Sequence, residues 1–284
     1  MTRIVIIGAS GYIGKFLIDA LEKTSYEILA IKHNASVNSN VEIFSADITN
    51  PSALDTVLKD DDVVLNLVGQ ITPDFQKFAL TNILGNIHLL NSCIQKKIKK
   101  IIFLSTINVY GENIEKPSLE DDFRKPSSDY AIIKSLIEDL YKIYSKQHIL
   151  NVSILRLSNI YGPNASGIIG KLIHSIDSTE PITVYHNGEQ IRDFLFIDDI
   201  ISGLVKIIDS PPNSYEIINL SSGLGVSIKN LISIIEKISH KKVNVKFSSE
   251  TPDEHCLCAN SQFAKNYFNF QINTSIEEGI KKLI

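Results

Sequence analysis

The feature that most constrains the fold is a glycine-rich turn that directly follows an apolar run at the start of the chain. Residues 4–7 read Ile-Val-Ile-Ile, residues 8–14 read Gly-Ala-Ser-Gly-Tyr-Ile-Gly, and a helical pattern begins near Lys15. This order predicts a buried strand, a turn whose backbone N–H groups approach a phosphate, and a helix N-terminus with partial positive charge. We therefore expect a dinucleotide pyrophosphate here, with these candidate cofactor-binding residues: Gly8, Ser10, Gly11, Tyr12, Ile13 and Gly14.

Length and charge exclude several classes of protein. A chain of 284 residues can bury a large core, as one large domain or one and a half. With 28 basic and 32 acidic residues the net charge is −4, so we expect neither nucleic acid nor an anionic membrane as partner. No apolar run is long enough for a bilayer, and the N-terminus does not resemble a signal peptide. The expected location is therefore the cytoplasm.

The cysteines predict neither disulfides nor a metal site. Their odd number, with Cys93, Cys256 and Cys258, argues against a disulfide framework in a cytoplasmic chain. His255, Cys256 and Cys258 lie close in sequence, but no second ligand cluster completes a metal site, and the alternation there suits a strand.

Short apolar runs alternate with helical patterns over the first two thirds of the chain. The runs lie at 28–31, 42–44, 63–68, 101–104 and 152–155, and the longest helical patterns at 75–95 and 130–148. This alternation predicts an α/β fold, a Rossmann-type doubly wound parallel sheet with ligands at the carboxyl ends of its strands. The expected domains are 1–160 for the dinucleotide, rejoined by about 193–210, and a smaller lobe at 161–284, with the ligand cleft between them.

Two further segments carry side chains suited to chemistry. Tyr130 and Lys134 are four residues apart, so they share one face of the predicted helix. The ammonium would favour the phenolate, and a positively charged nicotinamide would add to the lowering of the tyrosine pKa that base catalysis requires. Ser105 and Thr106 end the strand before this helix, where their hydroxyls can bind a substrate oxygen or only satisfy backbone groups at the turn.

Seven ordered motifs give the chain a family resemblance. They read GASGYIG at 8–14, LVG at 67–69, Asn82-x-x-Gly85, STINVYG at 105–111, YAIIK at 130–134, RLSNIYGP at 156–163 and RDFLFIDD at 192–199. Over nearly its whole length the chain resembles the extended short-chain dehydrogenase/reductase family, in its nucleotide-sugar epimerase, dehydratase and reductase branch. The resemblance implies a Rossmann domain for NAD or NADP and a C-terminal lobe for a nucleoside-diphosphate sugar.

The same resemblance implies roles by position. Tyr130 corresponds to the acid/base, Lys134 to its helper, and Thr106 to the catalytic hydroxyl. The other implied cofactor contacts are Asp47 (at adenine), Ile48, Leu67, Val68, Gly69, Asn82 and Ser105, with Tyr130 and Lys134. Implied substrate contacts are Thr106, Asn108 and Tyr130, with Asn159 and Arg192 at the diphosphate, although an ion pair with Asp193 is an alternative for Arg192.

Two departures from the family pattern narrow the expected activity. Dehydratases carry Asp-Glu directly after the catalytic threonine, whereas this chain has Ile107 and Asn108, which argues against dehydration. The end of the second strand has no carboxylate for the ribose 2′-hydroxyl, and Lys32 would meet a 2′-phosphate unless it points into solvent. We therefore expect NADP(H) to be favoured, with NAD(H) possible.

The leading hypothesis is an NAD(P)H-dependent reductase of a nucleoside-diphosphate keto-sugar, with a 4-keto-6-deoxyhexose as the expected substrate. The alternative is an NAD-dependent nucleotide-sugar 4-epimerase, which uses the same residues without net redox change. A nucleotide-sensing protein without catalysis is disfavoured by the intact set of Thr106, Tyr130 and Lys134. The resemblance also implies a homodimer through the helices at 75–95 and 129–145, with Ile133, Ile137 and Leu140 as expected contacts.

Overall fold

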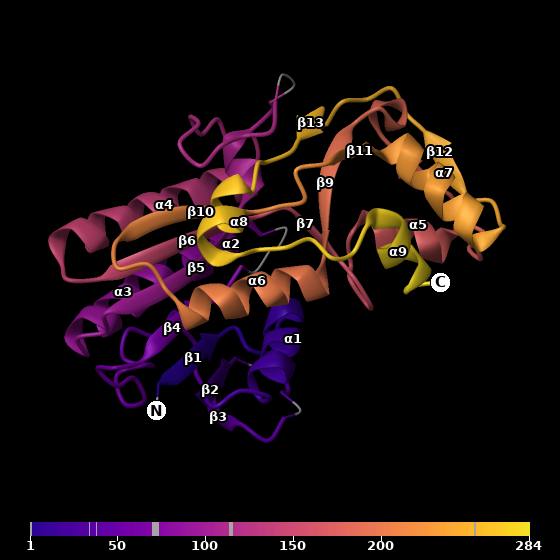
Figure 1. Ribbon diagram of the computed structural model, residues 1–284. Helices are drawn as coiled ribbons and strands as arrows, with labels where there is room; N and C mark the ends of the chain where they lie inside the picture. Colours follow the sequence, from indigo (N-terminus) through magenta and orange to yellow (C-terminus); the bar gives the residue numbers. More distant parts are fainter. Residues whose placement is uncertain (1, 34, 38, 70–73, 114–115, 253) are drawn as a thin grey trace. The chain divides into compact units, whose positions relative to one another are not determined.

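The computed structural model describes residues 2–33, 35–37, 39–69, 74–113, 116–252 and 254–284 (Figure 1). The strands are β1 (Arg3–Ile7), β2 (Glu27–Lys32), β3 (Glu42–Ser45), β4 (Val63–Asn66), β5 (Lys100–Thr106), β6 (Asn151–Leu157), β7 (Asn159–Tyr161), β8 (Ile182–Val184), β9 (Ile191–Phe196), β10 (Tyr215–Leu220), β11 (Gly225–Ser227), β12 (Val245–Phe247) and β13 (Cys256–Leu257). The helices are α1 (Tyr12–Leu21), α2 (Phe75–Ala79), η1 (Leu80–Leu84), α3 (Gly85–Gln95), η2 (Ile107–Tyr110), α4 (Asp129–Gln147), α5 (Ile168–Ser175), η3 (His186–Gly188), α6 (Ile197–Asp209), α7 (Ile228–Ser239), α8 (Gln262–Phe268) and α9 (Ile276–Lys281).

The chain divides into two compact units. Unit 1 consists of Met1–Thr106, Asp129–Arg156 and Leu204–Ile218, and unit 2 consists of Ile107–Ser128, Leu157–Gly203 and Asn219–Ile284. Each unit is therefore assembled from segments that are distant in sequence.

Unit 1 contains a seven-stranded sheet with the order β10-β6-β5-β4-β1-β2-β3. The pairs of β1 with β2 and β4, of β2 with β3, and of β4 with β5 are all parallel. Strand order therefore reverses between β1 and β4, because the chain first builds outward to β3 and then returns to the other side of β1. The predicted Rossmann-type doubly wound parallel sheet is confirmed.

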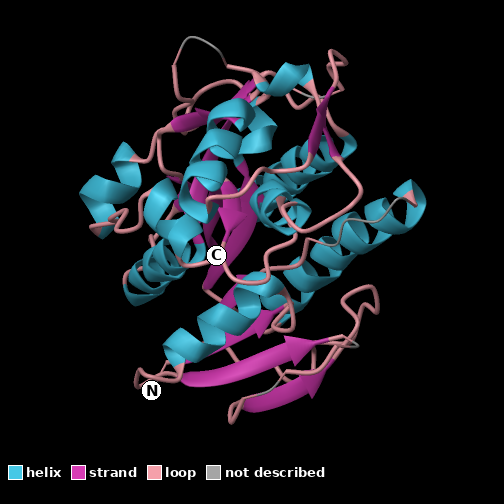
Figure 2. Ribbon diagram, turned by 90° about the vertical axis from the view of Figure 1, so that its right-hand side faces the viewer, coloured by secondary structure: helices cyan, strands magenta, loops and turns pink. Residues whose placement is uncertain are grey.

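Both faces of the sheet are covered at its central strands, which explains why β1 and β4 lack polar alternation. Every residue of β1 is buried, and the side chains of Val5 and Ile7 belong to a core cluster that also contains Leu89 and Leu90 of α3 and Ile133 and Ile137 of α4. The alternate residues, Ile4 and Ile6, are fully buried as well. Figure 2 shows the magenta strands and cyan helices of the fold from a second side. Burial on both faces selects β-branched residues throughout such strands.

The predicted helix at 75–95 contains a segment of different geometry. α2 continues into a π-helical turn, η1, before α3 begins. The amide of Asn82 donates to the carbonyl of Phe78 at 2.9 Å, and the amide of Asn86 donates to the carbonyl of Asn82 at 2.5 Å. Each amide side chain donates to the carbonyl group four residues before it, which the backbone N–H of an α-helix would otherwise use. This competition favours the wider π-helical turn.

One strand is shorter than expected. β4 ends at Asn66 rather than at residue 68, because the fully buried Asn66 side chain accepts the N–H of Val68 at 3.0 Å and turns the chain.

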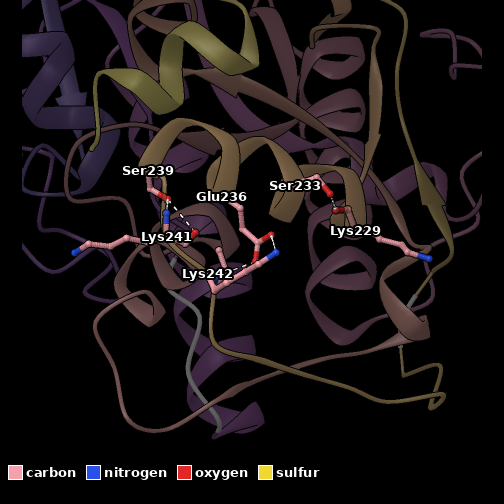
Figure 3. A network of polar contacts seen from close by, with 7 residues as sticks. Lys229, Ser233, Glu236, Ser239, Lys241 and Lys242 are labelled. Atoms are coloured by element: carbon pink, nitrogen blue, oxygen red, sulfur yellow. Dashed lines mark hydrogen bonds and ion pairs between the residues drawn. The ribbon is translucent and has the colours of Figure 1, made fainter.

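Unit 2 is built around β9, which pairs with β11, β13 and β7. A second, two-stranded sheet joins β12 to β8. Figure 3 shows Glu236 of α7 beside Lys242. The Glu236 carboxylate accepts a hydrogen bond from the Lys242 ammonium at 2.8 Å and one from the N–H of Val243 at 3.1 Å. These donors lower the pKa of Glu236 and anchor the chain after α7, although an exposed ion pair of this kind adds little stability.

We predict that Gly14→Ala destabilises unit 1. A Cβ at Gly14 would lie 2.5 Å from the carbonyl oxygen of Ala9, which is backbone and cannot move away freely. We expect a loss of about 2 kcal/mol in the free energy of unfolding, measured by urea denaturation. Gly167→Ala is the matched control: the new Cβ would lie 3.7 Å from the carbonyl oxygen of Ile160, and the loss of a glycine N-cap should cost less than about 1 kcal/mol. Equal losses in the two variants would contradict the steric argument.

Candidate active site

The glycine-rich turn lies where the strand order of the sheet reverses. Gly8 directly follows β1 and has a φ of +84°, a conformation that favours glycine. A Cβ at Gly8 would lie 3.3 Å from the backbone of both Leu67 and Val68, which follow β4. The tertiary structure thus brings two of the predicted cofactor segments together at the carboxyl ends of β1 and β4, where the segments that follow the strands turn to opposite faces of the sheet.

The other residues of the turn occupy the start of α1. Gly11 is the N-cap residue, and Tyr12, Ile13 and Gly14 form the first turn of the helix. Ser10 precedes the cap and is half-buried. Since the first N–H groups of a helix have no partner inside the helix, this turn is suited to an anion.

Tyr130 and Lys134 lie one turn apart on α4, as the sequence predicts. Tyr130 is half-buried, and its ring stacks on Phe78 with centroids 6.4 Å apart. Lys134 is only 3 % exposed, and its ammonium donates to the carbonyl oxygens of Leu104 at 2.8 Å and Val68 at 3.3 Å. The ammonium also lies 4.5 Å from the centre of the Phe103 ring.

Lys134 connects α4 to the predicted cofactor segment after β4. A Cβ at Gly69 would lie 3.3 Å from the Lys134 ammonium, so glycine at this position leaves room for the lysine. Val68, Gly69, Leu104 and Lys134 therefore form one contiguous group, drawn from the ends of β4 and β5 and from α4.

Burial moves the pKa values of the two side chains in opposite directions. It raises the pKa of Tyr130 to about 12, and it lowers the pKa of Lys134 to about 7, against an opposing effect of the Glu138 carboxylate. The sequence predicts that Lys134 lowers the pKa of Tyr130, but burial dominates in the protein alone. A tyrosine acting as base near neutral pH thus needs additional positive charge from a ligand.

The two hydroxyl residues at the end of β5 have different surroundings. Thr106 is the last residue of β5 and is 8 % exposed. Ser105 is 4 % exposed, and its hydroxyl donates to the Glu138 carboxylate at 2.5 Å. The Ser105 side chain thus has a partner inside unit 1, and its contact with cofactor stays a prediction.

The nucleotide end of the predicted cofactor site contains Asp47, which the family resemblance places at the adenine. The Asp47 carboxylate lies 3.5 Å from Nε2 of His33, the residue that directly follows β2. Asp47 also accepts the N–H and the hydroxyl of Thr49, and these hydrogen bonds lower its pKa. β2 carries no carboxylate of its own at its end, as the sequence indicates, and the tertiary structure brings Asp47, from the loop after β3, close to this end.

Ile48 and Asn82 are predicted cofactor residues that lie inside unit 1. Ile48 is buried, and a Cβ at Gly85 would lie 2.5 Å from its side chain, so glycine there lets α3 approach this loop. Asn82 is fully buried in η1. Lys32 is half-buried at the end of β2.

A buried polar network behind these residues was missed by the sequence argument. Asn66 donates to Asn86 at 2.7 Å, and Tyr141 donates to the same Asn86 oxygen at 2.9 Å. Asn66 and Asn86 are fully buried, so each needs such partners. Polar residues at strand ends were the available signal, but their partners on α3 and α4 are 20 and 75 residues away.

The predicted substrate residues Asn159 and Arg192 lie in unit 2 on neighbouring strands. β7 pairs with β9, and the amide of Asn159 donates to the carbonyl of Asp193 at 3.0 Å. The Arg192 guanidinium donates to the carbonyls of Ile191 at 2.9 Å and His255 at 3.4 Å. Asn108, in η2, is half-buried.

Asp193 serves to hold the loop after β10. Its carboxylate accepts the N–H of Ser222 at 2.9 Å, the Ser222 hydroxyl at 2.7 Å and the N–H of Gly223 at 2.9 Å, and the Cys258 thiol lies 3.3 Å away. Burial raises the pKa of Asp193, while these donors act in the opposite direction. The cysteines of the chain are free and buried. In the described part of the chain, no group of three or more His, Cys, Asp or Glu side chains is arranged to hold a metal ion.

None of the described helices is both long enough and apolar enough to span a bilayer.

We predict that Lys134→Met stabilises the cofactor-free protein, and does so most at low pH. Because burial lowers the pKa of Lys134 from 10.5 to about 7, the unfolded chain binds the lysine proton more tightly than the folded chain. The resulting destabilisation is complete below about pH 7 and disappears as the pH rises toward the unfolded value. Methionine should therefore raise the free energy of unfolding by a few kcal/mol near pH 6 and much less near pH 10. A gain that is independent of pH would contradict a buried charge.

Comparison with known proteins shows the family of the chain. The family model described as "NAD dependent epimerase/dehydratase family" matches residues 4–221. A UDP-N-acetyl-alpha-D-glucosaminuronate decarboxylase from Bacillus cytotoxicus is 30% identical, over 99% of this chain and 96% of the relative. A UDP-glucuronate 4-epimerase from Thermodesulfobacterium geofontis is 27% identical, over 99% of this chain and 94% of the relative.

A solved structure shows the same architecture. The UDP-glucuronic acid 4-epimerase from Bacillus cereus, in complex with UDP-glucuronic acid and NAD, superposes with a TM-score of 0.90 and 31% identity. The match covers 99% of this chain and 97% of that one. The family model, the sequence identity and the shared architecture lead to the same assignment. The chain belongs to the NAD-dependent epimerase/dehydratase family.

Proposed function

We propose that this protein is an NAD-dependent nucleotide-sugar 4-epimerase. The observation that carries the proposal is the Lys134 ammonium held against the backbone of Val68 and Gly69 after β4, with Tyr130 one turn before it on α4. This group lies in a chain that matches a 4-epimerase with bound NAD over nearly its full length.

The comparisons favour the epimerase over the reductase that was our leading hypothesis. The relatives named above are a decarboxylase and 4-epimerases, and the solved 4-epimerase holds NAD. A decarboxylase is a second candidate, because the decarboxylase relative is 30% identical over 99% of the chain.

The residues present fit a dinucleotide. Gly8, with its positive φ, leaves a space beside Leu67 and Val68 that a Cβ would narrow, and α1 begins directly after this turn. The turn would hold the pyrophosphate, and Asp47 and Ile48 would lie at the adenosine. Asp47 beside His33 disfavours the second negative charge of a 2′-phosphate, which supports NAD over the NADP(H) that we expected.

In this proposal, side chains of unit 1 transfer the proton of the sugar hydroxyl and bind its oxygen. Tyr130 removes the proton from the sugar hydroxyl and later returns it, and Thr106 donates a hydrogen bond to the same oxygen. Lys134, held by the carbonyls of Leu104 and Val68, binds a ribose hydroxyl and adds positive charge near Tyr130. Bound NAD supplies reversible hydride acceptance, so that the sugar carbon is oxidised and then reduced on its other face.

We propose that unit 2 binds the nucleoside diphosphate. The Arg192 guanidinium can bind phosphate in a bidentate manner, and Asn159 and Asn108 would contact the same ligand. Arg192 is 7 % exposed and fixed by two carbonyl oxygens, so its direction is set before substrate arrives.

We also propose a homodimer, but with contact residues on α4 that differ from those predicted from the sequence. Ile133 and Ile137 are buried in the core of unit 1 and cannot contact a second copy. Ile132, Leu136 and Ile143 on the same helix are between 41% and 49% exposed and would form the contact instead.

We predict that the purified protein, without added cofactor, interconverts the C4 epimers of UDP-glucuronate or of another UDP-hexose. Nuclear magnetic resonance distinguishes the epimers, and absorbance at 340 nm reports net consumption of NADH or NADPH. Tyr130→Phe should reduce turnover by about 10² to 10⁴-fold, because the acid/base proton is lost. Tyr144→Phe, on the same helix with its hydroxyl bonded to Asn91, should retain turnover.

Other products would overturn the assignment. Release of carbon dioxide from UDP-glucuronate would identify the decarboxylase. Stoichiometric use of a reduced cofactor on a 4-keto sugar nucleotide would restore the reductase.

We predict that Arg192→Ala raises the KM for the sugar nucleotide at least tenfold and leaves cofactor affinity unchanged, since a charge-assisted contact contributes about 2 kcal/mol. Lys229→Ala, which removes an exposed ion pair with Glu189 in the same unit, is the control and should change neither constant. A variant that unfolds more easily but binds substrate normally would instead assign Arg192 a structural role.

A further inference from the structure

A fully buried ion pair lies directly behind the catalytic face of α4. Glu138 is 0 % exposed, and Arg156, on β6, is 1 % exposed. One carboxylate oxygen accepts hydrogen bonds from Arg156 Nε at 3.1 Å and from the Ser105 hydroxyl at 2.5 Å. The other oxygen accepts a hydrogen bond from a terminal guanidinium nitrogen of Arg156 at 2.7 Å. This set joins α4, β5 and β6, and the reaction described above does not use it.

Stability alone does not explain such a pair. Two buried charges lose their hydration, and replacing them with apolar side chains is often neutral or stabilising. A requirement for the negative charge itself therefore deserves a test.

The charge of Glu138 lies one turn behind Lys134. The two residues are four apart on α4, on the face that also carries Tyr130. Burial lowers the pKa of Lys134 and so disfavours its charged form, whereas the negative charge of Glu138 raises this pKa and favours the charged form. From the other elements, β5 contributes the Leu104 carbonyl and Phe103 ring and the loop after β4 contributes the Val68 carbonyl, while Arg156 of β6 contacts Glu138.

The same carboxylate is tied to the end of β5. Ser105, which donates to Glu138, directly precedes Thr106, and Leu104, whose carbonyl holds Lys134, directly precedes Ser105. A shift of Glu138 would therefore disturb both segments that carry the proposed catalytic residues.

We propose that Glu138, oriented by Arg156 and Ser105, is a positioning residue that keeps Lys134 charged and fixes the end of β5 against α4. The structural part stands on unit 1 alone, and the consequence for turnover rests on the proposed function.

The first test is a double-mutant cycle between Glu138→Gln and Lys134→Met, measured as urea unfolding of the cofactor-free protein. If Glu138 attracts a charged Lys134, the two substitutions are not additive near pH 6, and the coupling is at least about fivefold in the unfolding equilibrium constant. Near pH 10, where the folded protein holds Lys134 neutral, the coupling should fall below about twofold. Additive effects at both pH values, or a coupling that does not change with pH, would overturn the proposal.

The second test uses turnover. Glu138→Gln should lower kcat at least tenfold near neutral pH, with unchanged affinity for NAD. The descending limb of kcat against pH should move to lower pH, because Lys134 without its counter-charge loses its proton more easily. Ser105→Ala, which removes one hydrogen bond but no charge, should cause a smaller loss. Glu236→Gln, an identical substitution at the exposed pair on α7, should change neither kcat nor its pH profile.

The design separates this proposal from the proposed function. A pH-dependent coupling in a protein that converts no sugar nucleotide would retain the role of Glu138 and reject the epimerase. Normal kcat and pH profile in Glu138→Gln, in an active enzyme, would reject the positioning role. If Glu138→Gln does not fold, the double variant Glu138→Gln/Arg156→Gln, which leaves no uncompensated charge, takes its place in both tests with the same criteria.

Discussion

The arrangement of the candidate site depends on the reversal of strand order between β1 and β4. At this point the loops after two adjacent parallel strands separate toward opposite faces of the sheet and leave their backbone groups accessible to a ligand. Gly8 follows one strand and Leu67 the other, and a Cβ on the glycine would approach the Leu67 backbone to 3.3 Å. β5 comes next to β4 in the sheet, so its Thr106 and the α4 residues Tyr130 and Lys134 belong to the same edge.

Polar groups buried behind this edge fix its geometry. Asn66, Asn86 and Tyr141 form one hydrogen-bonded group, and Ser105, Glu138 and Arg156 form another. Each group costs desolvation energy that only complete pairing offsets, and so each permits few alternative arrangements of α3, α4 and β5. Lys134 differs in that its burial opposes its own charge, so its ammonium is held at the expense of stability.

Membership of the epimerase/dehydratase family, the NAD-bound relative and the position of Asp47 support one consistent interpretation. An enzyme that oxidises and then reduces the same sugar carbon keeps its cofactor and requires one group that both takes and gives a proton. A half-buried tyrosine with a raised pKa suits the proton-giving half of this cycle, and a positively charged nicotinamide suits the other half.

The sequence by itself determined the doubly wound fold and the segments of the site, because both depend on local signals. The apolar runs predicted six of the seven strands of the sheet, β1 to β6, but not β10. The glycine spacing located the turn before α1, and the four-residue spacing placed Tyr130 and Lys134 on one helical face. The tertiary structure alone decided which groups are neighbours across long separations. It set Asp47 beside His33, buried Ile133 and Ile137 in the core instead of exposing them, replaced part of a helix with η1, and placed Glu138 against Arg156. Charge, burial and pKa depend on these neighbours, and no local pattern in the chain specifies which residues they are.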